Sequence, residues 1–477
     1  YYGRSDRSPL ALFHTYRHYG YTFEHIGRQA QASNAFLVGI SALFTPYVDE
    51  ALETAEVVKR FHPHCKIVMG GHHPTAFGGE VLQHPAVDYI IRGEGEQALP
   101  ALARALKAGK ENLEQIPGIG FKRTDGGLHL NSPAQVRSLD HLVLPASHLL
   151  NQKYYARNKR GSAVILTSRG CPLNCSYCCM GTASPLPYRR RSIDSVMREI
   201  ETAVVDHKAG FIDFEDETLA WNRAWFLKLL YAIQDRFKEK GPEFRAMNGL
   251  YPLSLDKEVV NAMRCAGFRA INLSLGTTSL PQLKRFNRPD VRKAFDQALE
   301  WAALYGMATV GYVIAAAPFQ RAETTVEDLL YLAQRNVLVG VSVFYPAPGS
   351  RDFRQCAASG LLPESYAQMR ASALPLAHTT TRTEAVTLLR LARIINFMKK
   401  LISRGERLPR PRKLPSKLPR HMDSFTLGRA LISSFLHDGK IQGVDATGRT
   451  YEHQTAMHLT TAFLSRFDTS ALAPVRA

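Results

Sequence analysis

The sequence predicts an α/β protein made of two successive α/β units and a mainly helical C-terminal region. Its 477 residues exceed what one hydrophobic core usually supports, so more than one domain is expected. Short apolar strands alternate with helical stretches twice along the chain, and a basic segment follows them. With 45% apolar and 21% charged residues, the composition is that of a folded globular protein, which excludes disorder as the main state.

The first unit spans residues 1–145. Apolar strands are expected at residues 35–40, 66–69 and 89–91, with helices over residues 10–18 and 48–61. Each strand ends in a turn of small or polar residues: Ser41, then Gly70 and Gly71, then residues 93–96. Since open α/β sheets bind ligands at the carboxyl ends of their strands, these turns are candidate binding positions.

The second unit spans residues 155–370 and contains six β/α repeats. The expected strands are residues 163–167, 211–214, 244–247, 270–275, 308–314 and 341–345, with helical periodicity between them. Six such units in series predict a (β/α)6 barrel or partial barrel of the TIM type. Chemistry in such barrels lies at the C-terminal ends of the strands.

The C-terminal region, residues 371–477, is basic and mainly helical. Residues 382–420 hold 12 Lys/Arg and two Asp/Glu, so they contribute +10 of the formal charge of +18. The segment begins with an amphipathic helix candidate whose apolar face contains Leu388, Leu391, Ile395, Met398 and Ile402.

Three explanations of this basic segment remain open. A solvated face with a linker is favoured. The second explanation is that the segment attracts an anionic substrate. Specific nucleic-acid binding is not expected, because aromatic side chains do not interleave with the cations. Contact with an anionic membrane surface is the third.

No uncharged apolar run approaches the roughly 18 to 20 residues that span a bilayer, and no signal peptide is visible. We therefore expect a cytoplasmic protein, with peripheral contact to the inner membrane face through residues 382–420 as an alternative. The sequence begins at Tyr1 and not at methionine, so a further upstream segment is expected.

Four of the seven cysteines crowd into residues 171–179. The segment RGCPLNCSYCCM places Cys171, Cys175 and Cys178 in a CxxxCxxC spacing directly after an expected strand. Three thiolates on one tight loop can hold three irons of a [4Fe-4S] cluster and leave the fourth iron open. A structural zinc site is the competing interpretation, but zinc sites normally close with a second ligand pair, which is absent here. We expect Cys179 to be a bystander.

This segment closely resembles the radical S-adenosylmethionine (SAM) family, in which the open iron chelates the amino and carboxylate groups of SAM. The resemblance implies that Tyr177 lies near the adenine and that Glu215 or Asp216 accepts hydrogen bonds from the SAM amino group. By the same resemblance, Arg288 meets the SAM carboxylate. Further SAM positions fall on the strand with Ser274 and on the YPAPGS turn with Pro346 and Gly349. The sequence departs from the family at Thr277, where a glutamate is common.

The first unit resembles the cobalamin-binding domain of cobalamin-dependent radical SAM enzymes. Its SxL element (Ser41 and Leu43) and its GG element (Gly70 and Gly71) carry the resemblance, and the GGHHPT and RGEGE segments extend it. The alternative is a cofactor-free Rossmann-like domain with glycine turns. The positions assigned to cobalamin are Ser41, Leu43, Gly70, Gly71, His72, Gly93 and Glu94.

The resemblance implies an enzyme that reductively cleaves SAM at a [4Fe-4S] cluster and uses cobalamin to methylate an unactivated carbon. A radical cyclase, oxidase or rearrangement enzyme is the alternative, and a non-catalytic cobalamin or metal sensor is the third possibility. The implied partners are a small-molecule or lipid substrate and an electron donor such as flavodoxin or ferredoxin. The sequence does not identify the substrate.

Overall fold

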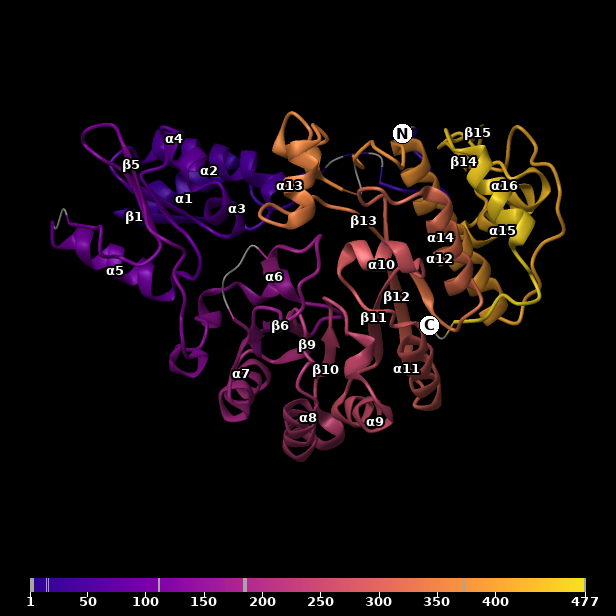
Figure 1. Ribbon diagram of the computed structural model, residues 1–477, viewed down its shortest axis with the longest axis horizontal. Coiled ribbons are helices and arrows are strands. Elements are labelled where there is room, and N and C mark those ends of the chain that lie inside the picture. Colours follow the sequence, from indigo (N-terminus) through magenta and orange to yellow (C-terminus); the bar gives the residue numbers. More distant parts are fainter. Residues whose placement is uncertain are drawn as a thin grey trace.

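The computed structural model describes residues 4–13, 15, 17–109, 112–182, 187–371 and 374–475. Figure 1 shows three regions, with the first α/β unit and the C-terminal region on the two flanks of a central barrel. The order of elements agrees with the predicted α/β class.

The first unit is a five-stranded sheet in the order β1-β2-β3-β4-β5. The first three strands are parallel, and the last two are antiparallel to their neighbours. Side chains alternate between the two faces of the sheet, so Ile67 and Met69 pack with α2 and α4 whereas Val68 packs with α5. The strands are β1 (Leu37–Ser41), β2 (Lys66–Gly70), β3 (Tyr89–Ile91), β4 (Ile119–Lys122) and β5 (Leu128–Leu130), and the helices are α1 (Phe23–Ser33), α2 (Val48–Phe61), α3 (His72–Ala76), α4 (Gly78–Gln83) and α5 (Gly95–Lys107).

The predicted helix over residues 10–18 is wrong for the residues that the structure describes, since these form turns and irregular chain; residues 14 and 16 lie outside them. The N-terminal segment instead runs to the C-terminal region, beside which the N-terminus lies in Figure 1. Asp6 pairs with His453 at 3.2 Å, and the Arg7 N–H donates to the Val444 carbonyl at 3.0 Å. These distant contacts replace local helical hydrogen bonds.

The barrel is a partial one built from two three-stranded parallel sheets. Their orders are β10-β9-β6 and β11-β12-β13. Leu250 joins the sheets because its N–H donates to the Asn272 carbonyl and its carbonyl accepts from Ser274. The strands are β6 (Gly161–Ile165), β9 (Ala209–Phe214), β10 (Glu243–Ala246), β11 (Ala270–Gly276), β12 (Ala308–Ala315) and β13 (Leu338–Val343).

Helices cover the outside of the barrel. These helices are α7 (Ile193–Val205), α8 (Arg223–Phe237), α9 (Lys257–Ala266), α11 (Arg292–Leu304) and α12 (Ala322–Ala333), whereas α10 (Leu280–Phe286) and α13 (Arg351–Ala358) lie at the C-terminal end of the strands (Figure 1). Between β6 and α7 lie the short elements β7 (Ser168–Arg169), α6 (Cys179–Thr182) and β8 (Arg189–Arg190). This insertion carries the cysteine motif at the C-terminal end of the first barrel strand, where barrel enzymes place their chemistry.

The C-terminal region does not expose the apolar face of its first helix. In α14 (Arg382–Ser403) the side chains of Leu388, Leu391, Ile395 and Met398 are fully buried in the core. The prediction of a solvated basic face holds only in part, since Arg393 and Lys400 are exposed but Arg390 and Lys399 are buried. The apolar face is not available to a bilayer. The remaining elements are α15 (Ser424–Asp438), β14 (Gln442–Val444), β15 (Thr450–Glu452) and α16 (Met457–Arg466).

Helix α14 also covers the edge of the barrel sheet. The Asn396 amide donates to the Val339 carbonyl and accepts from the Val339 N–H, both at 2.8 Å. One side chain thus satisfies two of the backbone groups that an edge strand such as β13 would otherwise present to solvent. Across the described residues, no helix combines the length and apolar character needed to cross a membrane.

Candidate functional site

The cysteine loop leaves β7 and is held in place by its own backbone. Cys175 is 6% exposed, and Cys171 and Cys178 are half-buried. The Ser176 N–H donates to the Phe286 carbonyl at 3.1 Å, and the Ser176 hydroxyl donates to Asp352 at 2.8 Å. The loop is thereby fixed to α10 and α13 at the residue that follows a predicted iron ligand.

The three motif cysteines Cys171, Cys175 and Cys178 are free thiols that lie close enough to influence one another electrostatically. Burial is the main cause that raises the pKa of Cys171 to about 11, and the other two thiols add to it. In the described part of the chain, no three His, Cys, Asp or Glu side chains converge as the ligands of one metal ion would. A four-iron cluster instead binds each thiolate to a different iron, so three separate thiols on one loop suit it.

The structure brings together three residues that the sequence assigns to SAM. Arg288 donates to the Tyr177 hydroxyl at 2.8 Å and to the Ser274 hydroxyl at 2.9 Å. The Arg288 Nε is buried and has no hydrogen-bond partner among the described residues. A buried guanidinium with an unused N–H is suited to bind a carboxylate, because charge-assisted hydrogen bonds are strong away from water. The assignment of Arg288 to the SAM carboxylate thus fits this geometry.

The acidic segment after β9 divides its residues between two roles. The Asp216 carboxylate accepts hydrogen bonds from the Thr167 N–H and hydroxyl and from the Ser168 hydroxyl, so it ties this segment to the chain before the cysteine loop. Asp216 is 2% exposed. Glu215 is half-buried beside it, and burial raises its pKa. The assignment of either residue to the SAM amino group stays a prediction.

Sequence reasoning missed Glu217. One oxygen of its carboxylate is buried without a hydrogen-bond partner among the described residues. Its charge acts on both Cys171 and Cys179, which places it beside the cysteine loop, and burial raises its pKa to about 7. The run Glu215-Asp216-Glu217 was visible in the sequence, but nothing there distinguished the three acids.

Two other predicted positions lie on connecting turns. Pro346 is buried, and Gly349 has a φ of +86°, which favours glycine, directly before the residue that caps α13. Thr277 is buried against Asp328 of α12, whose carboxylate also accepts from the Thr278 N–H at 2.6 Å. Roles for Pro346 and Gly349 in SAM binding stay predictions.

The carboxyl ends of β1 and β2 form an open, largely apolar end of the first unit. The side chains of Leu43 and Phe44 are 47% and 59% exposed, and Ser41 is also exposed. A Cβ at Gly70 would meet only the Ile91 carbonyl oxygen, at 3.8 Å. Small residues beside exposed apolar side chains leave room for a large macrocycle and a surface to cover, so this end fits the predicted cobalamin.

Gly71 and the two adjacent histidines shape the turn after β2. Gly71 has a φ of +118°, and a Cβ there would lie 2.6 Å from the Ala42 carbonyl oxygen, so only glycine fits. His72 is exposed. His73 is buried against Tyr366, its Nδ1 lies 3.2 Å from the Thr45 hydroxyl, and burial lowers its pKa to about 4. The cobalamin assignments of Gly71 and His72 stay predictions.

The RGEGE turn contacts the barrel. Glu94 binds Arg189 through both carboxylate oxygens, at 2.7 and 2.9 Å, and lies 3.2 Å from Arg169. Glu96 also pairs with Arg169, at 2.5 Å. Gly93 has a φ of +80° and packs against the backbone of Ala134. The structure thus assigns Glu94 to an ionic contact with the chain beside the cysteine motif, while cobalamin contact by Gly93 or Glu94 stays a prediction.

A second contact joins the loops after β1 and β2 to the C-terminal side of the barrel. Tyr345, after β13, hydrogen-bonds to Thr45. Arg370 pairs with Glu50 at 2.7 Å, and Tyr366 donates to Glu80 at 2.7 Å. The open end of the first unit therefore adjoins the barrel end that carries the cysteine loop (Figure 1).

Comparison with known proteins agrees with this geometry. The B12 binding domain family matches residues 12–103, and the Radical SAM superfamily matches residues 165–332. An uncharacterised methyltransferase of Pyrococcus horikoshii is 25% identical over 72% of this chain and 73% of its own length. The anaerobic magnesium-protoporphyrin IX monomethyl ester cyclase of Cereibacter sphaeroides is 31% identical over 50% of this chain, which spans only 39% of that relative.

Among solved structures, the radical S-adenosylmethionine methyltransferase TsrM from Kitasatospora setae, with cobalamin and a [4Fe-4S] cluster bound, has a similar fold. The TM-score is 0.59 at 18% sequence identity, covering 71% of this chain and 67% of that one. The two family matches fall on the two α/β units in the predicted order. The chain therefore combines a B12-binding domain with a radical SAM domain, in the order predicted from its resemblance to cobalamin-dependent radical SAM enzymes.

Proposed function

We propose that this protein is a radical SAM C-methyltransferase that uses a [4Fe-4S] cluster, SAM and cobalamin. One observation carries the proposal: the cysteine loop at the C-terminal end of the barrel adjoins the open end of the B12-binding unit, across the contacts of Glu94 with Arg169 and Arg189. This arrangement supports two cofactors facing one substrate position. Methyltransferase relatives support the reaction class.

When bound, the cluster and SAM supply a radical that removes hydrogen from an unactivated carbon, and cobalamin supplies the methyl group. The protein chain itself binds and orients SAM and cobalamin. Arg288, held by Tyr177 and Ser274, would bind the SAM carboxylate through its unused Nε–H, and the unpartnered oxygen of Glu217 would bind the amino group. The exposed Leu43 and Phe44 would pack on the macrocycle and would exclude water from the space between the units.

The test is an anaerobic assay with iron- and sulfide-reconstituted protein, hydroxocobalamin, dithionite and SAM. Formation of 5′-deoxyadenosine and S-adenosylhomocysteine, together with a substrate product heavier by one methylene unit, is the expected result. Protein that assembles the cluster and yields no 5′-deoxyadenosine would contradict the enzyme assignment and favour a sensor.

A radical cyclase or oxidase is the second candidate, because the cyclase relative shares 31% identity with half of the chain. The same assay separates the two reactions. A product lighter by two hydrogens, formed without S-adenosylhomocysteine, would support the cyclase or oxidase and refute methylation.

A further inference from the structure

Two helices that fix the cysteine loop also form a pocket on the protein surface. Helices α10 and α13 both bind Ser176, through the Phe286 carbonyl and the Asp352 carboxylate. Ser176 directly follows Cys175, so a single residue separates a predicted iron ligand from the wall of this pocket.

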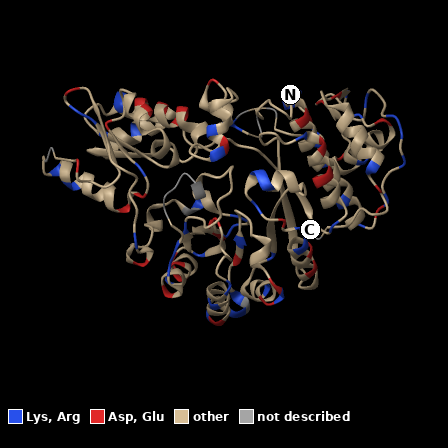
Figure 2. Cartoon of the chain, in the orientation of Figure 1, with Lys and Arg blue, Asp and Glu red and all other residues tan. Residues whose placement is uncertain are grey.

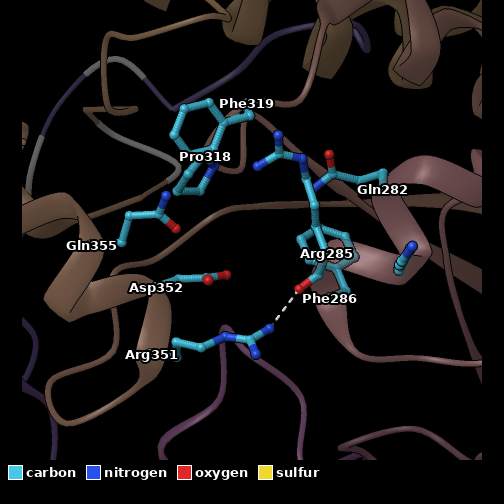
Figure 3. A pocket seen from close by; sticks show the side chains of 9 residues that line it. Gln282, Arg285, Phe286, Pro318, Phe319, Arg351, Asp352 and Gln355 are labelled. Atoms are coloured by element: carbon cyan, nitrogen blue, oxygen red, sulfur yellow. Dashed lines mark hydrogen bonds between the residues drawn. The ribbon is translucent and has the colours of Figure 1, made fainter.

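The pocket has a volume of about 190 Å³ (Figure 3). We call it the α10–α13 pocket. Arg351 lines the pocket and donates to the Arg285 carbonyl at 2.7 Å, which ties the first residue of α13 to the last turn of α10 (Figure 3). The wall contains Lys284, Arg285, Phe286, Phe319, Arg351 and Asp352.

The wall of this pocket has an excess of positive charge, because it contains three cations and one carboxylate. Lys284, Arg285 and Arg351 are exposed, and Figure 2 shows Lys and Arg on α10. Within the described residues, no carboxylate forms a salt bridge with any of these three cations. The acidic side chain in the wall, Asp352, is buried, accepts the Ser176 hydroxyl and interacts electrostatically with Arg285 and Arg351, so the three cations are only partly compensated. The field at the pocket mouth therefore attracts anionic partners.

An aromatic ring stands at the same mouth. Phe319 is 45% exposed, and the Arg285 guanidinium lies 4.5 Å from its ring centroid. Its backbone φ of +62° is one that residues other than glycine rarely adopt. An exposed aromatic ring among cations is typical of a protein contact surface, since interfaces are enriched in aromatic residues and Arg.

We propose that the α10–α13 pocket docks an acidic one-electron donor protein of the flavodoxin or ferredoxin class. The proposal rests on the proposed function, because reductive cleavage of SAM needs one electron from outside the chain. In the docked complex the donor is oxidised by one electron and the cluster is reduced by one electron, and no bond between the two proteins forms. Opposite charges speed the encounter, and electron-transfer interfaces are small and transient.

The test compares two reductants on the same reconstituted protein. In the double variant Lys284→Glu/Arg285→Glu, the KM for a purified flavodoxin, reduced by NADPH and its reductase, should rise about tenfold or more. SAM cleavage driven by dithionite, which needs no docking, should stay at the wild-type rate. Added NaCl should raise the wild-type KM for flavodoxin and change that of the variant much less.

A charge-matched control is Lys413→Glu/Lys417→Glu, at exposed positions of the C-terminal region, which should keep the wild-type KM for flavodoxin. Wild-type protein that fails with dithionite refutes the proposed function. If dithionite works and the KM for flavodoxin is equal in the variant, docking is refuted. Loss of SAM cleavage with both reductants in the variant also overturns docking, because it shows that Lys284 and Arg285 are needed for SAM cleavage itself. Saturable binding of inorganic phosphate that the variant loses, with an unchanged KM for flavodoxin, would identify a small-anion site instead.

Discussion

The contact between Glu94 and Arg189 offers a quantitative test of how the two units are joined. Their side chains are 9% and 10% exposed, and the bidentate pair has distances of 2.7 and 2.9 Å. Glu94 also accepts the Val136 N–H at 2.5 Å. Because removing one partner of a buried pair leaves the other charge uncompensated, Glu94→Gln and Arg189→Gln should each lower the free energy of unfolding by about 3 to 5 kcal/mol.

A double-mutant cycle isolates the pair. The double variant should lose less than the sum of the two single losses, by a coupling energy of about 2 to 3 kcal/mol. Urea unfolding of the apoprotein, followed by circular dichroism, measures the four values. Single losses below about 1 kcal/mol that simply add would refute the ionic contact. A cobalamin ligand role for Glu94 predicts a different outcome, in which Glu94→Gln weakens cobalamin binding and Arg189→Gln does not.

Three further predictions concern the site and the core. Alanine at any one of the three motif cysteines should abolish iron retention and 5′-deoxyadenosine formation, whereas Cys179→Ala should keep both. Iron analysis measures the first property and chromatography the second. Loss of either property in Cys179→Ala would contradict the motif assignment. Glu217→Gln should raise the KM for SAM about tenfold or more through a lost charge-assisted hydrogen bond, and an effect confined to Glu215→Gln would shift the role to Glu215. Burial lowers the pKa of Lys399 to about 7 from 10.5, so the free energy of unfolding should increase from pH 7 to 10.5, by an amount on the order of 4 to 5 kcal/mol. Lys399→Met should remove this increase, and a slope that persists in the variant would rule out Lys399 as its source.

Local patterns in the sequence predicted the strands well. Residues 89–91 match β3, and residues 66–69 and 308–314 each fall one residue short of β2 and β12. The last barrel strand was predicted at residues 341–345, whereas β13 is Leu338–Val343. The prediction runs past the end of the strand because the apolar run continues through Phe344 and Tyr345 into the loop that contacts the first unit. Apolar character alone does not separate a strand from a buried loop.

Contacts between distant segments could not be predicted in the same way. Glu94 and Arg189 lie 95 residues apart in the chain. The RGEGE turn therefore gave no sign that the Glu94 carboxylate would pair with Arg189. Glu217 was indistinguishable from its acidic neighbours until the fold placed it beside Cys171. The apolar stripe of α14 was visible, but its burial depends on the open edge of β13, which only the assembled barrel defines.

The course of the N-terminal segment has a practical consequence for dissecting the molecule. Leu10 is 4% exposed and belongs to the same core as the barrel and α14, although it precedes the B12-binding unit in sequence. Cutting the polypeptide between the two units would therefore remove Leu10 from the core of the barrel piece. The N-terminal segment of the other piece would lose the core against which it packs. Recombining separately produced halves is feasible only if residues 4–10 travel with the barrel, for example through circular permutation.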